Sequence, residues 1–166
     1  MPHRTIPTKL DLDQASWKIL EALQHNARQS FAELGRQIGL STPAAAERVH
    51  RLEEAGVITG YHVALDLAKL GIPIRVIVRL TIPGGDLQVR RTVAAIKDLT
   101  EIGRCHRITG DESFVIEAHV VSIRHMEALI DKLSTLGATS TSTVLSSPVQ
   151  RQEFSAWQIE AYGRYI

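Results

Sequence analysis

The chain has 166 residues, of which 44% are hydrophobic, and its 19 Lys and Arg nearly balance its 18 Asp and Glu. This balance excludes a strongly basic coat protein and a chain kept disordered by its own charge. The single cysteine, Cys105, excludes a disulfide framework and a multi-cysteine zinc site. No apolar run is long enough to span a membrane, and the first residues lack the apolar stretch of a signal peptide, so we expect a cytoplasmic protein.

Helical periodicity runs from Leu10 to about Gly56, and residues 10–65 are predicted to form one small domain. Asp11 is predicted to cap the first helix, a second helix is expected over residues 31–38, and Ser41 caps a third that runs to Ala55. One face of the third helix is apolar and comprises Ala45, Val49 and Leu52. Short helices joined by tight turns predict a helix-turn-helix, and Val57–Leu65 predicts a hairpin after it, which would make a wing.

The pattern changes to alternating strands and helices over residues 74–150. Apolar and polar residues alternate from Ile74 to Ile82, which is typical of a half-buried strand. The remaining elements give the order βαββαβ, the ferredoxin-like split, so the fold class is α+β. We expect residues 1–9 to be a flexible tail, 66–73 a linker and 151–166 a helical extension.

Longer sequence strings carry a resemblance to a known family. They are L-D-L-D and I-L-E-A-L-Q within Leu10–Gln24, E-L-G-R-Q-I-G-L-S at Glu33–Ser41, and E-R-V-H-R-L-E-E-A-G-V-I-T-G-Y at Glu47–Tyr61. Together they resemble the DNA-binding half of the Lrp/AsnC (feast/famine) transcriptional regulators. R-C-H-R-I-T-G-D at Arg104–Asp111 stands where that family carries its effector-binding turn.

The resemblance implies a sequence-specific regulator with a winged helix-turn-helix and a ferredoxin-like regulatory domain. Its implied partners are double-stranded DNA, an amino acid or related small molecule, and further copies of the chain. Those copies would form a homodimer or a higher oligomer such as an octamer.

The third helix is the candidate DNA-binding element. Its first turn is small and polar enough for close approach to a groove, and its arginines reach phosphates or guanine edges. The candidate contact residues are Ser41, Thr42, Ala44, Ala45, Arg36, Arg48 and Arg51. The alternative is an exposed helix whose arginines pair with Glu47, Glu53 or Glu54. Residues 1–66 hold seven Lys and Arg against eight Asp and Glu, which predicts weak binding per monomer.

The turn around Gly110 is the candidate effector site. Its carboxylates would accept from a ligand amine, and its backbone N–H groups would receive a ligand carboxylate. The candidate residues in the turn are Thr109, Gly110, Asp111, Glu112 and Ser113. The resemblance adds Thr141 and Thr143, because the last strand of the family's domain helps to line the pocket; otherwise they are ordinary edge-strand threonines. In the family the turn continues with an aromatic residue and an Asp, where this chain has Glu112 and Ser113. The alternative is a plain hairpin that uses Gly and Asp for its geometry.

Two other functions stay open. Some proteins resembling the family decarboxylate a tetrapyrrole, and an enzyme of that kind would draw on His106, His119 and His125. A regulator partner without its own DNA binding also fits a first half without net positive charge. The sequence shows no metal-ligand spacing, phosphate loop or nucleophile elbow, so we expect no metal, cofactor or catalytic residue.

Overall fold

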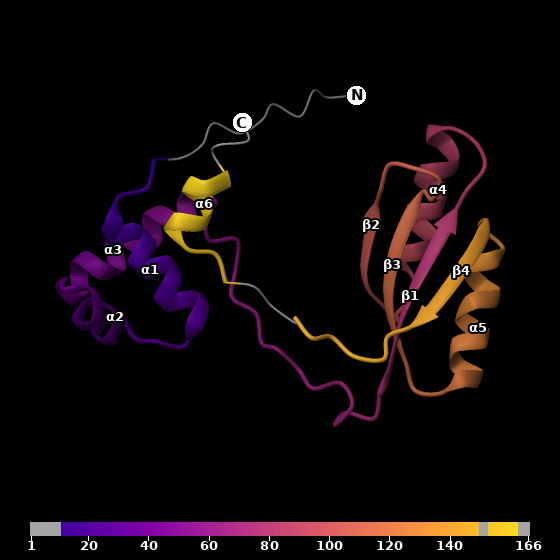
Figure 1. Cartoon of the computed structure of the whole chain (residues 1–166), viewed down its shortest axis with the longest axis horizontal. Helices are drawn as coiled ribbons and strands as arrows, with labels where there is room; N and C mark the ends of the chain where they lie inside the picture. Colours follow the sequence, from indigo (N-terminus) through magenta and orange to yellow (C-terminus); the bar gives the residue numbers. More distant parts are fainter. Residues whose placement is uncertain (1–10, 150–152, 163–166) are drawn as a thin grey trace. The chain divides into compact units, whose positions relative to one another are not determined.

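The computed structural model describes residues 11–149 and 153–162. Its chain divides into two compact units (Figure 1). The helical unit contains the described residues up to Val63 together with those from Val149 onward, and the regulatory unit spans Ala64–Pro148. No helix among the described residues is long and apolar enough to cross a membrane.

The helical unit is built on α1 (Gln14–His25), α2 (Phe31–Ile38) and α3 (Thr42–Glu54). Their apolar faces meet in a core that includes Ile19, Leu23, Leu34, Val49 and Leu52. The cap predicted at Asp11 is wrong, because Asp13 holds that position and its Oδ1 accepts from the Ser16 N–H at 2.8 Å. Leu12, just before this cap, is partly buried against the helical core.

A tight turn joins α2 to α3. Ser30 and Glu33 form a capping box at the start of α2, and Gly39 ends it with a φ of 78°. A Cβ on Gly35 would lie 2.6 Å from the carbonyl oxygen of Leu40, so this close approach requires glycine. Ser41 then caps α3 by accepting from the Ala44 N–H.

The hairpin predicted over Val57–Leu65 is wrong, since no strand is formed there. The N–H groups of Val57 and Ile58 both donate to the carbonyl of Leu52, which holds them at the end of α3. Both side chains are half-buried against the helical core. The rest of the segment, up to Leu65, also forms no strand. Within its described residues, the first unit is therefore a helix-turn-helix without a wing.

The regulatory unit is a four-stranded antiparallel sheet with two helices. In chain order it contains β1 (Ile74–Thr81), α4 (Asp86–Lys97), β2 (Ile102–Arg107), β3 (Phe114–Val120), α5 (Ile123–Ser134) and β4 (Ala138–Thr143). The strand order is β2-β3-β1-β4, and Figure 1 shows both helices beside the sheet. The predicted ferredoxin-like order is confirmed.

Alternation along the strands separates two faces of this sheet. Val78, Phe114 and Ile116 are buried with Leu129 and Leu133 of α5, so one face forms the core. The opposite face, called the open face below, carries half-buried residues of β1 and β3. These residues are Arg75, Ile77, Arg79, Val115, Glu117 and His119.

The C-terminal helix α6 (Ala156–Tyr162) belongs to the helical unit, and residues 151–152 and 163–166 of the predicted extension lie outside the described residues. The sequence spacing also predicts an apolar stripe along that extension, formed by Phe154, Trp157, Ala161 and Tyr165. Phe154 and Trp157 of that stripe are 44% and 69% exposed. Tyr165 lies outside the described residues.

Candidate DNA-binding and effector sites

The N-terminal end of α3 is exposed. Ser41, Thr42 and Pro43 face solvent, and Ala44 is half-buried. Ala45 has a relative exposure of 0%, so its side chain is unavailable to a DNA groove and leaves the predicted contact set. The reason is periodicity, because Ala45 shares its helix face with Val49 and Leu52.

Arg48 points to α1 and not to open solvent. Its Nη1 lies 2.6 Å from Asp13 Oδ2 and 3.4 Å from Ser16 Oγ. Asp13 also caps α1, so one carboxylate serves both helices. Hydrogen bonds from Ser16, followed by the Arg48 guanidinium, lower the pKa of Asp13 to about 2. The Arg48 side chain is 34% exposed and fixes α3 against the start of α1.

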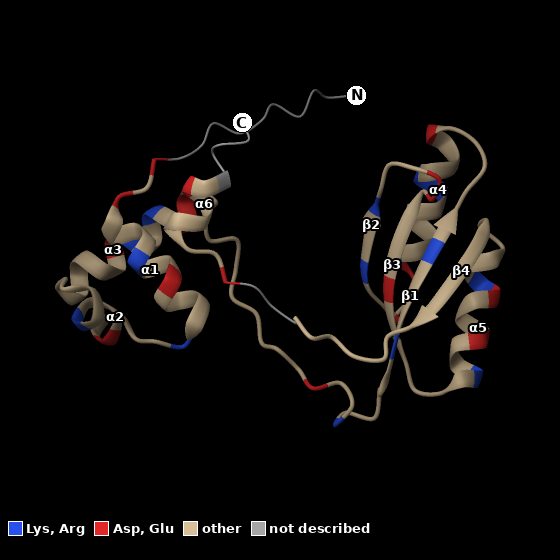
Figure 2. Cartoon of the chain, in the orientation of Figure 1, with Lys and Arg blue, Asp and Glu red and all other residues tan. Residues whose placement is uncertain are grey.

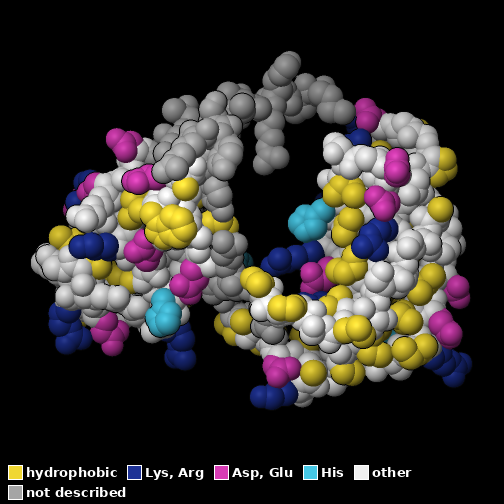
Figure 3. Space-filling view, in the orientation of Figure 1, with side chains coloured by type: hydrophobic (Ala, Val, Ile, Leu, Met, Phe, Trp, Pro, Cys, Tyr) yellow, Lys and Arg dark blue, Asp and Glu magenta, His cyan; other side chains and the backbone are white. Residues whose placement is uncertain are grey.

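Arg51 and Arg36 have the more open positions. Arg51 forms an ion pair with Glu47 one turn away, and the two side chains are 72% and 64% exposed. This is one of the pairings that the alternative interpretation of the helix expects. Arg36, in the last turn of α2, is exposed. Figure 2 shows acidic and basic residues interspersed along the ribbon of the helical unit, and Figure 3 shows their side chains interspersed on the face in view.

His50 is a surface feature of α3 that the sequence interpretation left at the margin. Its ring meets the ring of Phe31 on α2 edge to face, with centroids 5.9 Å apart. Its Nδ1 lies 3.1 Å from Glu53 Oε2. Both His50 and Phe31 are exposed beside Arg51. The signal for this pair is tertiary, since Phe31 and His50 belong to different helices.

The Thr109–Ser113 turn is fixed to the end of β1. The Ser113 N–H donates to Leu80 O at 2.9 Å, and Ser113 Oγ accepts from the Ile82 N–H at 3.2 Å. Thr81 Oγ1 donates to the carbonyl of Asp111 at 3.3 Å. Thr109, Gly110 and Asp111 are exposed, while Glu112 is half-buried. The turn therefore presents the Asp111 carboxylate on a rigid backbone.

Thr141 and Thr143 lie apart from this turn within the chain. They pair with Val78 and Val76, so they share the helix-covered face of the sheet with those residues. Ala138 pairs with Thr81, next to the turn, which places Thr141 about 10 Å and Thr143 about 17 Å back along the strand. The Thr141 hydroxyl is buried without a hydrogen-bond partner in the described chain. One chain does not bring the predicted effector residues together.

The three histidines of the enzyme alternative also lie apart. His106 pairs with Val115 on the sheet, and His119 lies 3.6 Å from Glu117 on the open face. His125 belongs to α5, where it contacts Glu101. Among residues 11–149 and 153–162, no group of three or more His, Cys, Asp or Glu could hold a metal ion.

Comparison with known proteins assigns both units. Residues 12–53 match the AsnC-type helix-turn-helix domain, and residues 75–154 match the Lrp/AsnC ligand binding domain. The chain is 36% identical over 137 residues to the transcriptional regulator LrpC of Bacillus subtilis, covering 82% of this chain and 94% of LrpC. It is 35% identical over 147 residues to the leucine-responsive regulatory protein of Haemophilus influenzae, covering 86% and 89%.

Solved structures agree with this assignment. The structure of B. subtilis LrpC has a TM-score of 0.80 at 34% identity, covering 86% of this chain and all of LrpC. A Neisseria meningitidis transcriptional regulator in complex with L-Met has a TM-score of 0.83 at 22% identity, covering 90% and 99%, and shares the fold. The named relatives are transcriptional regulators, which supports a regulator over the enzyme alternative. The chain belongs to the Lrp/AsnC family of DNA-binding helix-turn-helix transcriptional regulators.

Proposed function

We propose that this regulator docks the exposed start of α3 into double-stranded DNA and that an amino acid or related small molecule modulates the docking. It acts in the cytoplasm as a homodimer or a higher oligomer such as an octamer. The observation that carries the DNA half is the α2–α3 pair. Its tight turn exposes Ser41 and Thr42 while the opposite face of α3 holds the core.

The proposed DNA contacts are Ser41, Thr42, Ala44, Arg36 and Arg51, with Arg51 as the principal one. Its pairing with Glu47 is exposed on both sides, and such surface pairs contribute about 0–1 kcal/mol. A good bidentate contact to a base contributes about 1–3 kcal/mol, so DNA can displace Glu47. Arg48 supports the docking indirectly, through the position of α3.

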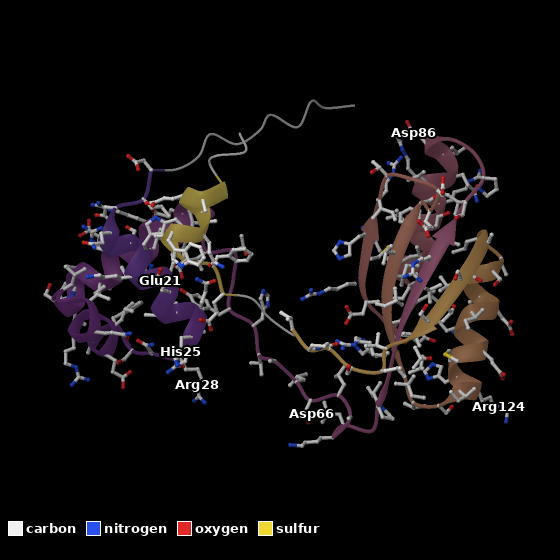
Figure 4. All side chains as sticks on the ribbon, in the orientation of Figure 1. Glu21, His25, Arg28, Asp66, Asp86 and Arg124 are labelled. Atoms are coloured by element: carbon white, nitrogen blue, oxygen red, sulfur yellow. The ribbon has the colours of Figure 1, made fainter. Side chains whose placement is uncertain are left out.

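Fluorescence anisotropy on operator DNA tests this proposal. Arg51→Ala should weaken specific binding roughly tenfold to a hundredfold. Arg124→Ala, at an exposed position on α5 of the regulatory unit, is the matched control and should bind like the wild type (Figure 4). Equal affinity of Arg51→Ala and the control in matched salt would contradict the docking. A wild-type chain that binds no genomic DNA fragment would favour the role of a partner for other regulators.

The proposed effector site is centred on the Thr109–Ser113 turn. Asp111 supplies a counter-charge for an amine, and the exposed backbone of the turn receives the ligand carboxylate. Support for an amino acid comes from the relatives, one named leucine-responsive and one in complex with L-Met. Because register separates Thr141 and Thr143 from the turn, we propose that a neighbouring copy brings its own Thr141 and Thr143 to the site.

The open face of the sheet is the proposed homodimer surface. Ile77 and Val115 give it a half-buried apolar centre. Arg75 lies 3.7 Å from Glu117 beside this centre, which partly neutralises the charge that two packed copies would bury. We therefore expect the regulatory unit to hold the oligomer together.

A further inference from the structure

The segment that follows residue 152 is bound to α1. The Gln24 side chain donates from Nε2 to the carbonyl of Phe154 at 2.9 Å, and the Phe154 N–H donates to Gln24 Oε1 at 2.9 Å. One side-chain amide therefore satisfies both backbone groups of Phe154. The two residues are 130 positions apart in sequence.

A second contact lies one helical turn earlier on α1. Glu21 Oε1 accepts from the Ala156 N–H, the first residue of α6, at 3.3 Å. Figure 4 labels Glu21 near α6. The start of α6 is also stabilised by a local contact, in which the Ser155 N–H and hydroxyl both donate to Gln158 Oε1, at 2.8 and 3.0 Å. The chain is thus fixed to α1 at successive turns on one side of that helix.

This segment begins where the match to the family's ligand-binding domain ends. The ligand-binding domain match ends at residue 154, and the LrpC structure is covered in full by 86% of this chain. The regulatory unit is joined to the helical unit at both of its ends. One connection follows Val63, and the other runs from the end of β4 at Thr143 to Phe154.

We propose that residues 153–162 form a strap that holds the helix-turn-helix by α1 and limits its movement relative to the regulatory unit. The eleven residue steps from Thr143 to Phe154 span at most about 40 Å when fully extended, so the contact between Phe154 and Gln24 keeps Gln24 tethered to the end of β4 by that length of chain. With the strap released, a single connection remains and the helical unit samples more orientations. The strap contacts are exposed hydrogen bonds, so the strap can open without unfolding either unit.

The strap deepens the proposed function, because it determines how the helix-turn-helix is presented to DNA. A restrained unit loses less orientational freedom when it docks, which favours binding. Releasing the strap should therefore weaken DNA binding while the number of phosphate contacts, and with it the salt dependence, stays unchanged. This part rests on DNA binding by α3, but the restraint itself does not.

A distance measurement between the units tests the strap without DNA or effector. Spin labels are placed at Ala27→Cys, in the α1–α2 turn, and at Arg124→Cys on α5, in a Cys105→Ser background. Both label positions are exposed. Excess unlabelled chain removes distances between copies. Double electron–electron resonance then gives the intramolecular distance distribution.

Gln24→Leu removes both hydrogen bonds to Phe154 at nearly constant side-chain size, and deletion of residues 153–166 removes the strap. Gln37→Leu, at an exposed position on α2, is the matched control. We expect a narrow distribution for wild type and control, a broad one for both strap variants, and a loss of DNA affinity of roughly threefold to tenfold with the salt slope kept. A distance distribution of the same width in all four proteins overturns the proposed strap. A chain that shows the broadening but binds no DNA retains the strap and refutes the proposed docking instead.

Discussion

Glu101 links the connection between α4 and β2 to helix α5. Its carboxylate is 8% exposed and accepts from Lys132 Nζ at 3.1 Å. His125 Nε2 lies 3.2 Å away, and the Val121 N–H donates to the other ring nitrogen of His125, so Nε2 carries the hydrogen and donates to Glu101. The backbone N–H of Glu101 itself, then Lys132 and His125, lower the pKa of Glu101 to about 2 against the opposing effect of burial.

Glu101→Gln keeps the shape of this side chain and removes its charge. A pKa lowered from 4.5 to about 2 corresponds to about 3 kcal/mol of folded-state stability at neutral pH. Lys132 is 54% exposed and solvent screens its charge, so we expect a loss of about 2 kcal/mol. Because the folded pKa is the lower one, the stabilisation is complete above pH 4.5 and disappears as the pH falls towards 2. By pH 3, about half of the difference between wild type and variant should be gone.

Urea unfolding at pH 7 and pH 3 measures this difference. Both tryptophans, Trp17 and Trp157, belong to the helical unit, so their fluorescence follows that unit. The remaining change in far-UV circular dichroism follows the regulatory unit. The control is Glu127→Gln, at an exposed position on α5, which should change the free energy of unfolding by less than about 0.5 kcal/mol. If the difference in unfolding free energy between wild type and Glu101→Gln is as large at pH 3 as at pH 7, the reasoning is refuted.

Three further predictions concern the effector turn, the open face and the helix-turn-helix turn. Asp111→Asn should weaken the binding of a cognate amino acid roughly tenfold to a hundredfold and uncouple it from DNA affinity, whereas the exposed Asp131→Asn should not; thermal shifts with an amino-acid panel decide this. Ile77→Asp should give monomers in sedimentation, and Leu87→Asp, which is 65% exposed on α4, should leave the oligomer intact; an unchanged oligomer in both contradicts the open-face dimer. Gly35→Ala should destabilise the helical unit by about 1–3 kcal/mol, because its Cβ would meet a backbone oxygen at 2.6 Å; an unchanged fluorescence midpoint excludes this.

Local chemistry explains which parts of the fold could be predicted from the sequence. Ser41 caps α3 as expected, because a cap depends on residues within one turn, and Ser122 caps α5 in the same way. Alternation of apolar and polar residues predicted β1 for the same reason. The prediction of a hairpin after α3 was wrong because the N–H groups of Val57 and Ile58 bind the end of α3, and strand propensity gives no information about such a contact.

The candidate sites depended more on tertiary structure. Arg48 has a local context typical of a DNA contact, but its partner Asp13 lies 35 residues earlier in another helix. Thr141 was placed with the turn by the resemblance, whereas the register with Val78 sets it back along the sheet. The site residues therefore stay predictions, and the structure identifies Arg51, not Arg48, as the arginine to test first.

Charge pairing within the helical unit has a consequence for how this regulator binds DNA. Arg48 is neutralised by Asp13 and Arg51 is paired with Glu47, in a region whose formal charge was already slightly negative. A single unit therefore has few cations to offer to phosphates, and its binding should be weak. Two helical units held in one oligomer would bind DNA bivalently, and the resulting gain in affinity depends on how narrowly the positions of the two units are restrained. The proposed strap on α1 would supply that restraint, so the proposed oligomer and strap together would replace the positive charge that the helix-turn-helix lacks.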